Sequence, residues 1–243
     1  MLIASDVHAG AAPPAQERAF LSWLEHAAET ASRIVLNGDL FDFWFEYASG
    51  PTRGHDVLLR ALRCVVERGV PVTLLGGNHD WWGGRYLTEE IGLEFLREPV
   101  VRELAGRRTL IAHGDGLGRG DLGYKLLRPV LRSPLARWAF ARLPPRLGDR
   151  LAGRVSRTQR KWGHWGPRQE ARADALAEWA RARLLAEPDL EMIVLGHAHR
   201  PELIEAPEGR WYVNSGDWVI HRTYVVLERG ERPRLCTWGP EPS

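Results

Sequence analysis

The chain contains little cysteine and no long apolar run, and each shortage excludes a class of protein. Only Cys64 and Cys236 occur among 243 residues, which excludes a disulfide framework and is typical of a reducing compartment. No uninterrupted apolar stretch approaches the roughly 18 residues that a membrane-spanning helix needs. The strand-like stretch LIAS at 2–5 is not preceded by the basic and hydrophobic regions of a signal peptide. We therefore expect a cytoplasmic protein.

Two catalytic motifs are also absent. The sequence has no Walker loop and no H-E-x-x-H pair, so nothing supports a P-loop NTPase or a zinc protease of that type. The remaining composition, 44% hydrophobic and 26% charged residues, is that of an ordinary globular protein. A chain of this length can form one large core, and we expect a single domain over 1–243.

Acidic residues are scarce in one segment. Residues 119–172 contain fourteen Arg or Lys and three acidic residues, although the whole chain has a net charge of only +2. The segment predicts short helices that carry cationic side chains on one face and apolar side chains on another. These helices are separated by Pro129, Pro134, Pro144 and Pro145.

A longer helix is expected at about 168–185, and we interpret 119–186 as a basic helical insertion. The positive charge of 119–172 would suit peripheral contact with an anionic membrane, on the inner face of that membrane. Such charge also attracts nucleic acid, but no nucleic-acid-binding module is recognisable, so we do not expect nucleic acid as a partner.

Runs of β-branched and apolar residues predict strands at 1–5, 33–37, 70–75, 107–112, 191–195, 211–214 and 222–228. Helical periodicity predicts helices at 14–29 and 54–68. Alternation of strand and helix at this spacing indicates an α/β fold with a largely parallel sheet that is buried on both faces. The last three runs lie so close together that we expect hairpin connections between them.

Five of these runs are followed directly by side chains that bind metal ions. The five motifs are SDVHAG at 5–10, NGDLFD at 37–42, GNHD at 77–80, AHGDG at 112–116 and GHAHRP at 196–201. The carboxyl ends of parallel strands meet at one edge of a sheet, so the motifs should converge there. Each motif alone has an ordinary structural explanation, but five in succession favour a site.

Seven candidate ligands are too many for one ion and suit two ions about 3.5–4 Å apart. They are Asp6, His8, Asp39, Asn78, His113, His197 and His199. Imidazole, carboxylate and amide ligands together favour Mn, Fe or Zn over calcium or a thiolate-bound ion.

The order D-x-H, G-D-x-x-D, G-N-H-D, a later histidine and G-H-x-H resembles the calcineurin-like metallophosphoesterases. The resemblance implies a double β-sandwich flanked by helices and a hydrolytic centre of two divalent ions, with Mn expected and Fe or Zn as alternatives. It implies that Asp39 bridges the two ions. One ion would be held by Asp6, His8 and His199, and the other by Asn78, His113 and His197.

The same resemblance implies that His79 is not a ligand. It would lie beside the phosphate as an acid or a charge stabiliser, and Asp42 would fix its tautomer and orientation. For Asp80 we expect a role in stabilising the turn.

Three stretches resemble one branch of the family, which contains the UDP-2,3-diacylglucosamine pyrophosphohydrolases of lipid A biosynthesis. They are GDLFDFW at 38–44, HGDGLGRGDLGY at 113–124 and GHAHRP at 196–201. The resemblance implies a lipid-linked nucleotide as the phosphate-containing substrate, with the insertion as a lid over the acyl chains. The substrate contacts that it implies are Asp121, Tyr124, Ser156, Arg157, Arg160 and Lys161.

Several alternatives stay open at this point. The branch often carries Arg where this chain has His79, so a general nucleotide pyrophosphatase or phosphodiesterase, or a nuclease, is an alternative. A non-catalytic metal-binding scaffold is another, although the presence of all seven ligands favours an enzyme. The flanking tryptophans are either an apolar wall of the site or core residues, and they are Trp44, Trp81, Trp82 and Trp218.

Overall fold

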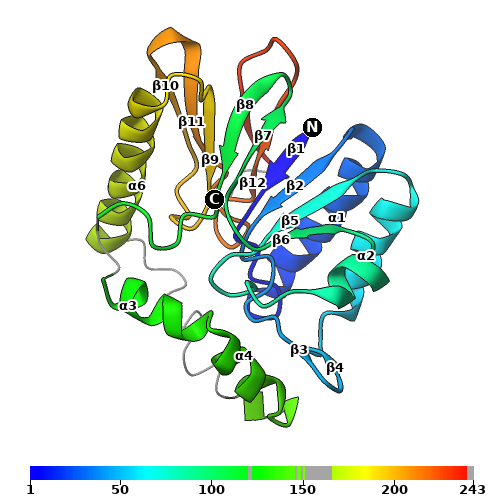
Figure 1. Ribbon diagram of the computed structural model, residues 1–243. Coiled ribbons are helices and arrows are strands. Elements are labelled where there is room, and N and C mark those ends of the chain that lie inside the picture. The colour runs from blue at the N-terminus through cyan, green and yellow to red at the C-terminus, as the bar shows by residue number, and fades with distance from the viewer. Residues whose placement is uncertain (120–121, 146, 149, 151–165, 240–243) are drawn as a thin grey trace.

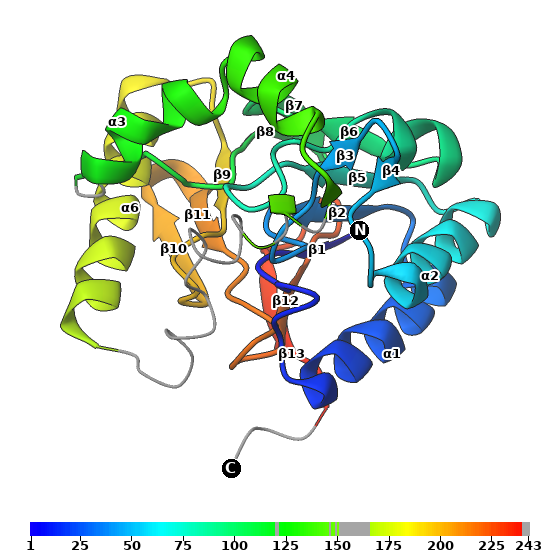
Figure 2. The ribbon, with the colours of Figure 1, turned by 90° about the horizontal axis from the view of Figure 1, so that it is seen from below.

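The computed structural model has four layers, in the order helices, sheet, sheet, helix (Figure 1). The structure describes residues 1–119, 122–145, 147–148, 150 and 166–239. Helices α1 and α2 lie on one side of the paired sheets and α6 on the other, as the view from below also shows (Figure 2). The helical segments are α1 (Pro14–Thr30), α2 (Asp56–Glu67), η1 (Tyr86–Glu90), α3 (Leu122–Leu131), α4 (Pro134–Ala141), α6 (Pro167–Ala186) and η3 (Pro207–Gly209).

The first sheet has the strand order β13-β12-β1-β2-β5-β6. Strands β1, β2, β5 and β6 are parallel, and β12 and β13 add antiparallel at one edge. Every residue of β1, β2 and β5 is buried, which explains why these runs are apolar without alternation. The strands are β1 (Leu2–Ala4), β2 (Ile34–Asn37), β5 (Val72–Leu75), β6 (Glu94–Leu96), β12 (Thr223–Val226) and β13 (Arg234–Thr237).

The second sheet has the order β10-β11-β9-β8-β7, and a separate short hairpin is formed by β3 and β4. The hairpins expected among the last three predicted strands are wrong. Strand β9 pairs parallel with β11 because β10 intervenes, and the chain then crosses to the first sheet to form β12. The strands are β3 (Glu46–Tyr47), β4 (Gly50–Pro51), β7 (Val100–Leu104), β8 (Arg107–Ile111), β9 (Met192–Leu195), β10 (Glu202–Ala206) and β11 (Arg210–Asn214).

The two sheets pack face to face, which confirms the expected double β-sandwich of the α/β class. Alternate strand residues serve different cores, because successive side chains point to opposite faces. Ile3 and Val35 face the other sheet, whereas Ala4 and Leu36 face α1 and α2. At the carboxyl end of β2, the side-chain amide of Asn37 donates across the interface to the Ala112 carbonyl at 3.0 Å. The two sheets therefore meet firmly at the edge that carries the motifs.

The range 119–186, expected as one insertion, contains two kinds of helix. Helices α3 and α4 lie outside the four layers, below the ends of the strands (Figure 1). Helix α6 instead packs on the second sheet through small and apolar residues, namely Ala173, Leu176, Ala177, Ala180 and Leu184. Helix α6 is therefore a layer of the fold and not part of a lid. The expectation of a lid is kept only for the residues of 119–186 that precede α6. Among the helices described, none is both long enough and apolar enough to cross a membrane.

Two of the four flanking tryptophans are core residues. Trp44 and Trp218 are fully buried in the core beneath α1 and α2, where Trp218 contacts the rings of Phe20 and Trp23. The expectation that these two tryptophans form an apolar wall of the site is therefore wrong. Trp81 is buried and Trp82 half-buried in the loop after β5, where their indole nitrogens donate to the carbonyls of Arg97 and Leu131.

Candidate metal centre

Ligand-type side chains from both sheets converge below the ends of the strands. Three overlapping groups have all their ligand atoms within 4.8 Å of one another: Asp6, His8 and His199; His8, Asp39 and His79; and Asp39, His113 and His197. The first group is one predicted ligand set, and the third joins His113 and His197 of the other set to Asp39. Asp39 and His8 each belong to two of the groups, and the bridging role of Asp39 stays a prediction. The structure thus brings six of the seven predicted ligands into these groups.

The backbone at these residues is unusual and directs the side chains inward. Five of the predicted ligands have a positive φ, a region that residues other than glycine rarely adopt, and they are Asp6, His8, Asp39, His197 and His199. Each such residue costs on the order of 1–3 kcal/mol and persists only where its surroundings impose it. Gly77 permits one close approach, since a Cβ there would lie 2.2 Å from Asp39 Oδ1. Strain of this kind, concentrated in one cluster, indicates a functional site.

Backbone amides orient the two buried carboxylates. Asp6 Oδ2 accepts from the His197 amide at 2.9 Å, and Asp39 Oδ1 accepts from the His79 amide at 2.9 Å. The other oxygens face imidazoles: Asp39 Oδ2 lies 3.2 Å from His113 Nε2, and Asp6 Oδ1 lies 3.5 Å from His199 Nε2. Each carboxylate therefore has one oxygen held by the protein and one directed into the centre.

The residues present suit metal ions. Buried polar atoms normally have hydrogen-bond partners, and those without one need an explanation. Within the described part of the chain, four predicted ligand atoms are buried and have no such partner: Asp6 Oδ1, His8 Nε2, Asn78 Oδ1 and His113 Nε2. Two carboxylates, imidazoles and an amide oxygen form a donor set for divalent transition metals. A cation would coordinate these atoms and remove the cost of burying them without partners.

The electrostatics of the centre also favour cations. Burial alone lowers the pKa of His113, but the Asp39 carboxylate outweighs burial and raises this pKa well above its usual value. Conversely, His113 and His79 hold the pKa of Asp39 well below its usual range in spite of burial. A negative potential that favours a proton on His113 favours a metal cation at the same place.

Two of the imidazoles are held by a partner on their second ring nitrogen, an arrangement common around metal sites. His113 Nδ1 donates to the Asn37 carbonyl at 2.9 Å, and His199 Nδ1 donates to Asp217 Oδ2 at 3.2 Å. In both residues Nε2 is left to face the carboxylates. Burial lowers the pKa of His199, but Asp6 and Asp217 outweigh it and raise the pKa to about 9.

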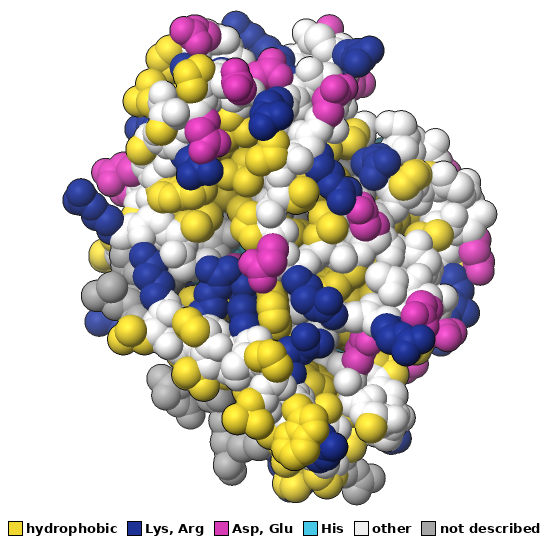
Figure 3. Space-filling model, viewed as in Figure 1, with side chains coloured by type: hydrophobic (Ala, Val, Ile, Leu, Met, Phe, Trp, Pro, Cys, Tyr) yellow, Lys and Arg dark blue, Asp and Glu magenta, His cyan; other side chains and the backbone are white. Residues whose placement is uncertain are grey.

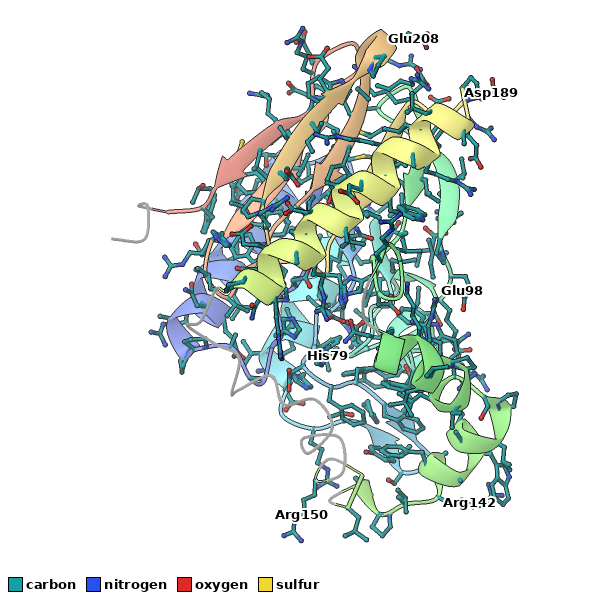
Figure 4. All side chains as sticks on the ribbon, turned by 90° about the vertical axis from the view of Figure 1, so that its left-hand side faces the viewer. His79, Glu98, Arg142, Arg150, Asp189 and Glu208 are labelled. Carbon is teal, nitrogen blue, oxygen red and sulfur yellow. The ribbon has the colours of Figure 1, made fainter. Side chains whose placement is uncertain are left out.

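His79 lies near the middle of the molecule, below the ends of the strands (Figure 4). Its Nδ1 donates to the backbone carbonyl of Asp42 at 2.6 Å, and its Nε2 lies 4.0 Å from Asp39 Oδ2. The Asp42 carboxylate lies 3.6 Å from both His79 Nδ1 and His8 Nδ1. The expected role of Asp42 stays a prediction, and the contact that supports it runs mainly through the carbonyl.

Asp80 does more than stabilise its own turn. Its carboxylate is fully buried and accepts from the Gly77 amide at 2.7 Å and from the Leu40 amide at 2.7 Å. Longer contacts reach the amides of Asp39 and Phe41, both at 3.3 Å. Burial, with the Asp39 charge nearby, raises the pKa of Asp80 to about 6. Asp80 therefore joins the GNHD turn to the loop that carries Asp39.

Two acidic residues near the centre were not predicted. Asp217 holds His199, and its Oδ1 accepts from the amides of the following turn, at 2.7–3.1 Å. Asp115 is buried two residues after His113, where it accepts from Tyr124 and Arg132 at 2.8 and 2.9 Å. Their sequence signals, GDW at 216–218 and HGDG at 113–116, are too short to assign a role.

The predicted substrate contacts are only partly described. Tyr124 lies on α3 with its hydroxyl bound to Asp115, which places it close to the His113 loop. The other predicted contacts lie outside the residues that the structure describes, and they are Asp121, Ser156, Arg157, Arg160 and Lys161.

Replacement of Asp217 by asparagine should weaken metal binding by about 10–100-fold, the usual effect of losing a partner of a metal-ligating histidine. The asparagine amide would donate toward His199 Nδ1 and so favour the tautomer with its proton on Nε2, the nitrogen needed for the metal. Titration of the metal-free protein with Mn or Co measures the effect. His221 Nδ1 lies 3.3 Å from the same Asp217 oxygen, so His221→Gln is the matched control and should bind metal normally. Equal losses in both variants would contradict this role.

Comparison with known proteins agrees with the geometry. The family model for calcineurin-like phosphoesterases matches residues 1–201. A UDP-2,3-diacylglucosamine hydrolase of Porphyromonas gingivalis is 30% identical over 92% of each chain. Proteins of the same name from Escherichia coli O7:K1 and Stutzerimonas stutzeri are 31% and 32% identical, over 93% and 90% of this chain and 94% and 90% of their own. Among solved structures, a dimetal phosphatase from Danio rerio aligns over 98% of each chain with 12% identity and a TM-score of 0.43.

The family match covers most of the chain and includes all five motifs, and the relatives match it over nearly their whole length. The chain belongs to the calcineurin-like phosphoesterase family.

Proposed function

We propose that the protein hydrolyses the pyrophosphate bond of UDP-2,3-diacylglucosamine or of a closely related lipid-linked nucleotide. The observation that carries this proposal is the position of helices α3 and α4, which bring apolar and cationic side chains next to a two-metal type of centre. The relatives named UDP-2,3-diacylglucosamine hydrolase, which match over 90–93% of the chain, support the choice of substrate.

Two divalent ions, for which we propose Mn, would supply a metal-activated hydroxide and offset charge on the phosphoryl oxygens. One ion would be held by Asp6, His8 and His199, and the other by Asn78, His113 and His197. Both ions would be held by Asp39. The Asp42 carbonyl can only accept, so it keeps a proton on His79 Nδ1. His79 Nε2 is then the atom that exchanges a proton or hydrogen bond with the phosphoryl group or the leaving group.

An aromatic cluster joins the loop after Asp42 to α4, with Phe43, Trp82 and Phe140 half-buried at its surface and Phe45 buried beneath them. Phe43 directly follows Asp42, and its ring centroid lies 6.1 Å from Trp82 and 5.9 Å from Phe140 of α4. Phe140 also contacts Phe45 at 4.8 Å. We propose that the acyl chains lie along this surface while the pyrophosphate reaches the centre. Tyr124 and the predicted contacts outside the described residues would bind the polar part of the substrate.

The lipid proposal predicts that Phe140→Ala lowers kcat/KM for UDP-2,3-diacylglucosamine by about tenfold or more. Bis-p-nitrophenyl phosphate has no acyl chain, and its turnover should change little. Acyl contacts remote from the phosphorus help to position the reacting bond, so kcat should fall as well as affinity. Leu185→Ala, at an exposed leucine of α6, is the matched control. Faster turnover of UDP-sugars without acyl chains would instead indicate a general nucleotide pyrophosphatase.

The outer faces of α3 and α4 suit an anionic membrane surface. Four large apolar side chains there are more than half exposed, and they are Leu126 (80%), Val130 (60%), Leu135 (73%) and Trp138 (56%). Figure 3 shows hydrophobic side chains over this part of the molecule with Lys and Arg beside them. We propose that this face contacts the membrane that contains the lipid substrate.

Membrane contact predicts co-sedimentation with vesicles that contain phosphatidylglycerol. The double variant Leu135→Ser/Trp138→Ser should reduce the bound fraction severalfold, because it removes apolar surface that would enter the interface. Leu185→Ser removes an equally apolar side chain from α6 and should not reduce binding. Equal binding of all three proteins would refute this contact.

A further inference from the structure

A cleft separates α3 from the loops that follow β5, β6 and β8. Its walls include Gly76, Pro99 and Leu117 together with the charged residues discussed below, and it is open to solvent. Of the seven candidate metal ligands, only His113 lines it. The cleft is therefore a neighbour of the metal centre and has a different lining.

The charged lining of the cleft is strongly cationic. Arg97, Arg128 and Arg132 face it, and Asp115 is the one carboxylate among the lining residues. The lining residues thus have two positive charges in excess, since a metal-bound His113 is neutral, and the exposed Glu98 approaches Arg128 and Arg132 only at 3.9 Å. Figure 3 shows dark blue Lys and Arg side chains gathered across this part of the surface. Glu98, labelled beside α3 in Figure 4, lies outside the lining and is 63% exposed.

The three guanidinium groups have far more hydrogen-bond donors than partners. Each has five N–H donors, about fifteen in total. With the described residues they make two hydrogen bonds: Arg132 to Asp115 at 2.9 Å and Arg97 to the Gly83 carbonyl at 2.8 Å. Arg128 approaches Asp115 and Glu98 only at 3.6 and 3.9 Å. Most donors of a partly buried cluster are thus available to a ligand.

The like charges are also held together against their repulsion. Burial and the nearby Arg137 lower the pKa of Arg97, so this cation lies in an unfavourable environment. Arg132 is further fixed over the Trp81 ring, with its Cζ 4.8 Å from the ring centroid. Planar guanidinium forks match the paired oxygens of a phosphate group, and an oxyanion would offset the surplus charge.

We propose that this cleft is a second oxyanion site, separate from the metal centre, which binds a phosphate-type group. Its occupant would bridge Arg128 of α3 and Arg132 of the following turn to Arg97 of the core and so hold α3 in place. The group has two possible sources, free phosphate or the headgroup of an anionic lipid, because the cleft adjoins the apolar faces of α3 and α4. The site does not depend on which phosphoester the metal centre cleaves.

The test is calorimetric titration of the Mn-loaded protein with inorganic phosphate at constant ionic strength. The expected result is two binding events, one at the metals and one in the cleft. Arg128→Gln should weaken the cleft event by about tenfold or more, since charge-assisted hydrogen bonds are lost. Asp39→Ala should remove the metal event and leave the cleft event. Arg142→Gln, at the residue that follows α4 and outside the lining, controls for the loss of one positive charge.

The Arg128 side chain has only the long contacts to Asp115 and Glu98 among the described residues, so its replacement should leave the fold and the metal content intact, which metal analysis verifies. Competition by phosphatidylglycerol vesicles, but not by phosphatidylcholine vesicles, would identify a lipid headgroup as the source, and no competition would identify free phosphate. A single phosphate event in the wild-type protein, or equal affinities of Arg128→Gln and Arg142→Gln, would overturn the proposal.

Discussion

Replacement of Asp39 by alanine is expected to abolish both metal loading and the turnover of bis-p-nitrophenyl phosphate. Asp39 Oδ2 lies 3.2 Å from His113 Nε2 and 3.8 Å from His8 Nε2, so one oxygen faces ligands of both predicted ions. Asp39 Oδ1 is fixed by the His79 amide. Without this carboxylate, the remaining imidazoles would lose the charge that joins the two ligand sets.

Metal analysis after saturation with Mn measures the first effect, with two ions per chain expected for the wild type. Asp189→Ala is a suitable control, because Asp189 is an exposed aspartate in the turn after α6, at the end of the molecule away from His79 (Figure 4). Asp39→Asn should retain the shape of the side chain but not its charge, and it should also lose an ion. Two ions in Asp39→Ala would show that Asp39 is no bridge, and fewer than two in the wild type would refute the dinuclear centre.

The central strands and the ligands were predictable because both depend on local sequence. Strands β1, β2 and β5 are buried on both faces, so each required an apolar run, and a ligand motif follows each run directly. The parallel arrangement then brings the ends of the runs together. The convergence of the motifs thus follows from periodicity and from the general arrangement of parallel sheets.

The edge strands were not predicted, since half of their residues face solvent and their composition is polar. β7 reads VVREL with one fully buried residue, and β10 reads ELIEA with none. Such runs resemble loops in a single sequence. The hairpin expected between 191–195 and 211–214 failed for the same reason, because β10 was not recognised between them.

The partners of the ligands were not predictable because they come from distant parts of the chain. Asp217 binds His199 across 18 residues, and Asp80 reaches the amides of Asp39 and Leu40 across about forty residues. Nothing local marks these contacts. The positive φ of Asp6 or His199 is likewise imposed by the surrounding loops, against the preference of the residue itself. Tertiary structure, and not propensity, determines the second layer of the site.

Replacement of His79 by alanine should leave two ions bound and lower kcat by roughly 10²–10⁴, the usual contribution of a positioned acid or base. His79 shares one group with His8 and Asp39, so its position alone would also permit a role as a ligand. Its contacts favour the catalytic role: Nδ1 is bound to the Asp42 carbonyl, and Nε2 remains 4.0 Å from the Asp39 carboxylate.

A catalytic role and a ligand role for His79 predict different metal contents and kcat values in the variants. In a protein where His79 only exchanges a proton, His79→Ala keeps its metal affinity while KM for bis-p-nitrophenyl phosphate changes little and kcat falls. His79→Gln restores a hydrogen bond but not an exchangeable proton, so it should recover only part of kcat. His113→Ala is the matched comparison, because loss of a true ligand should remove an ion as well as activity. Loss of an ion from His79→Ala would show that His79 is a ligand, and equal kcat values in His79→Ala and the wild type would exclude it from the chemistry.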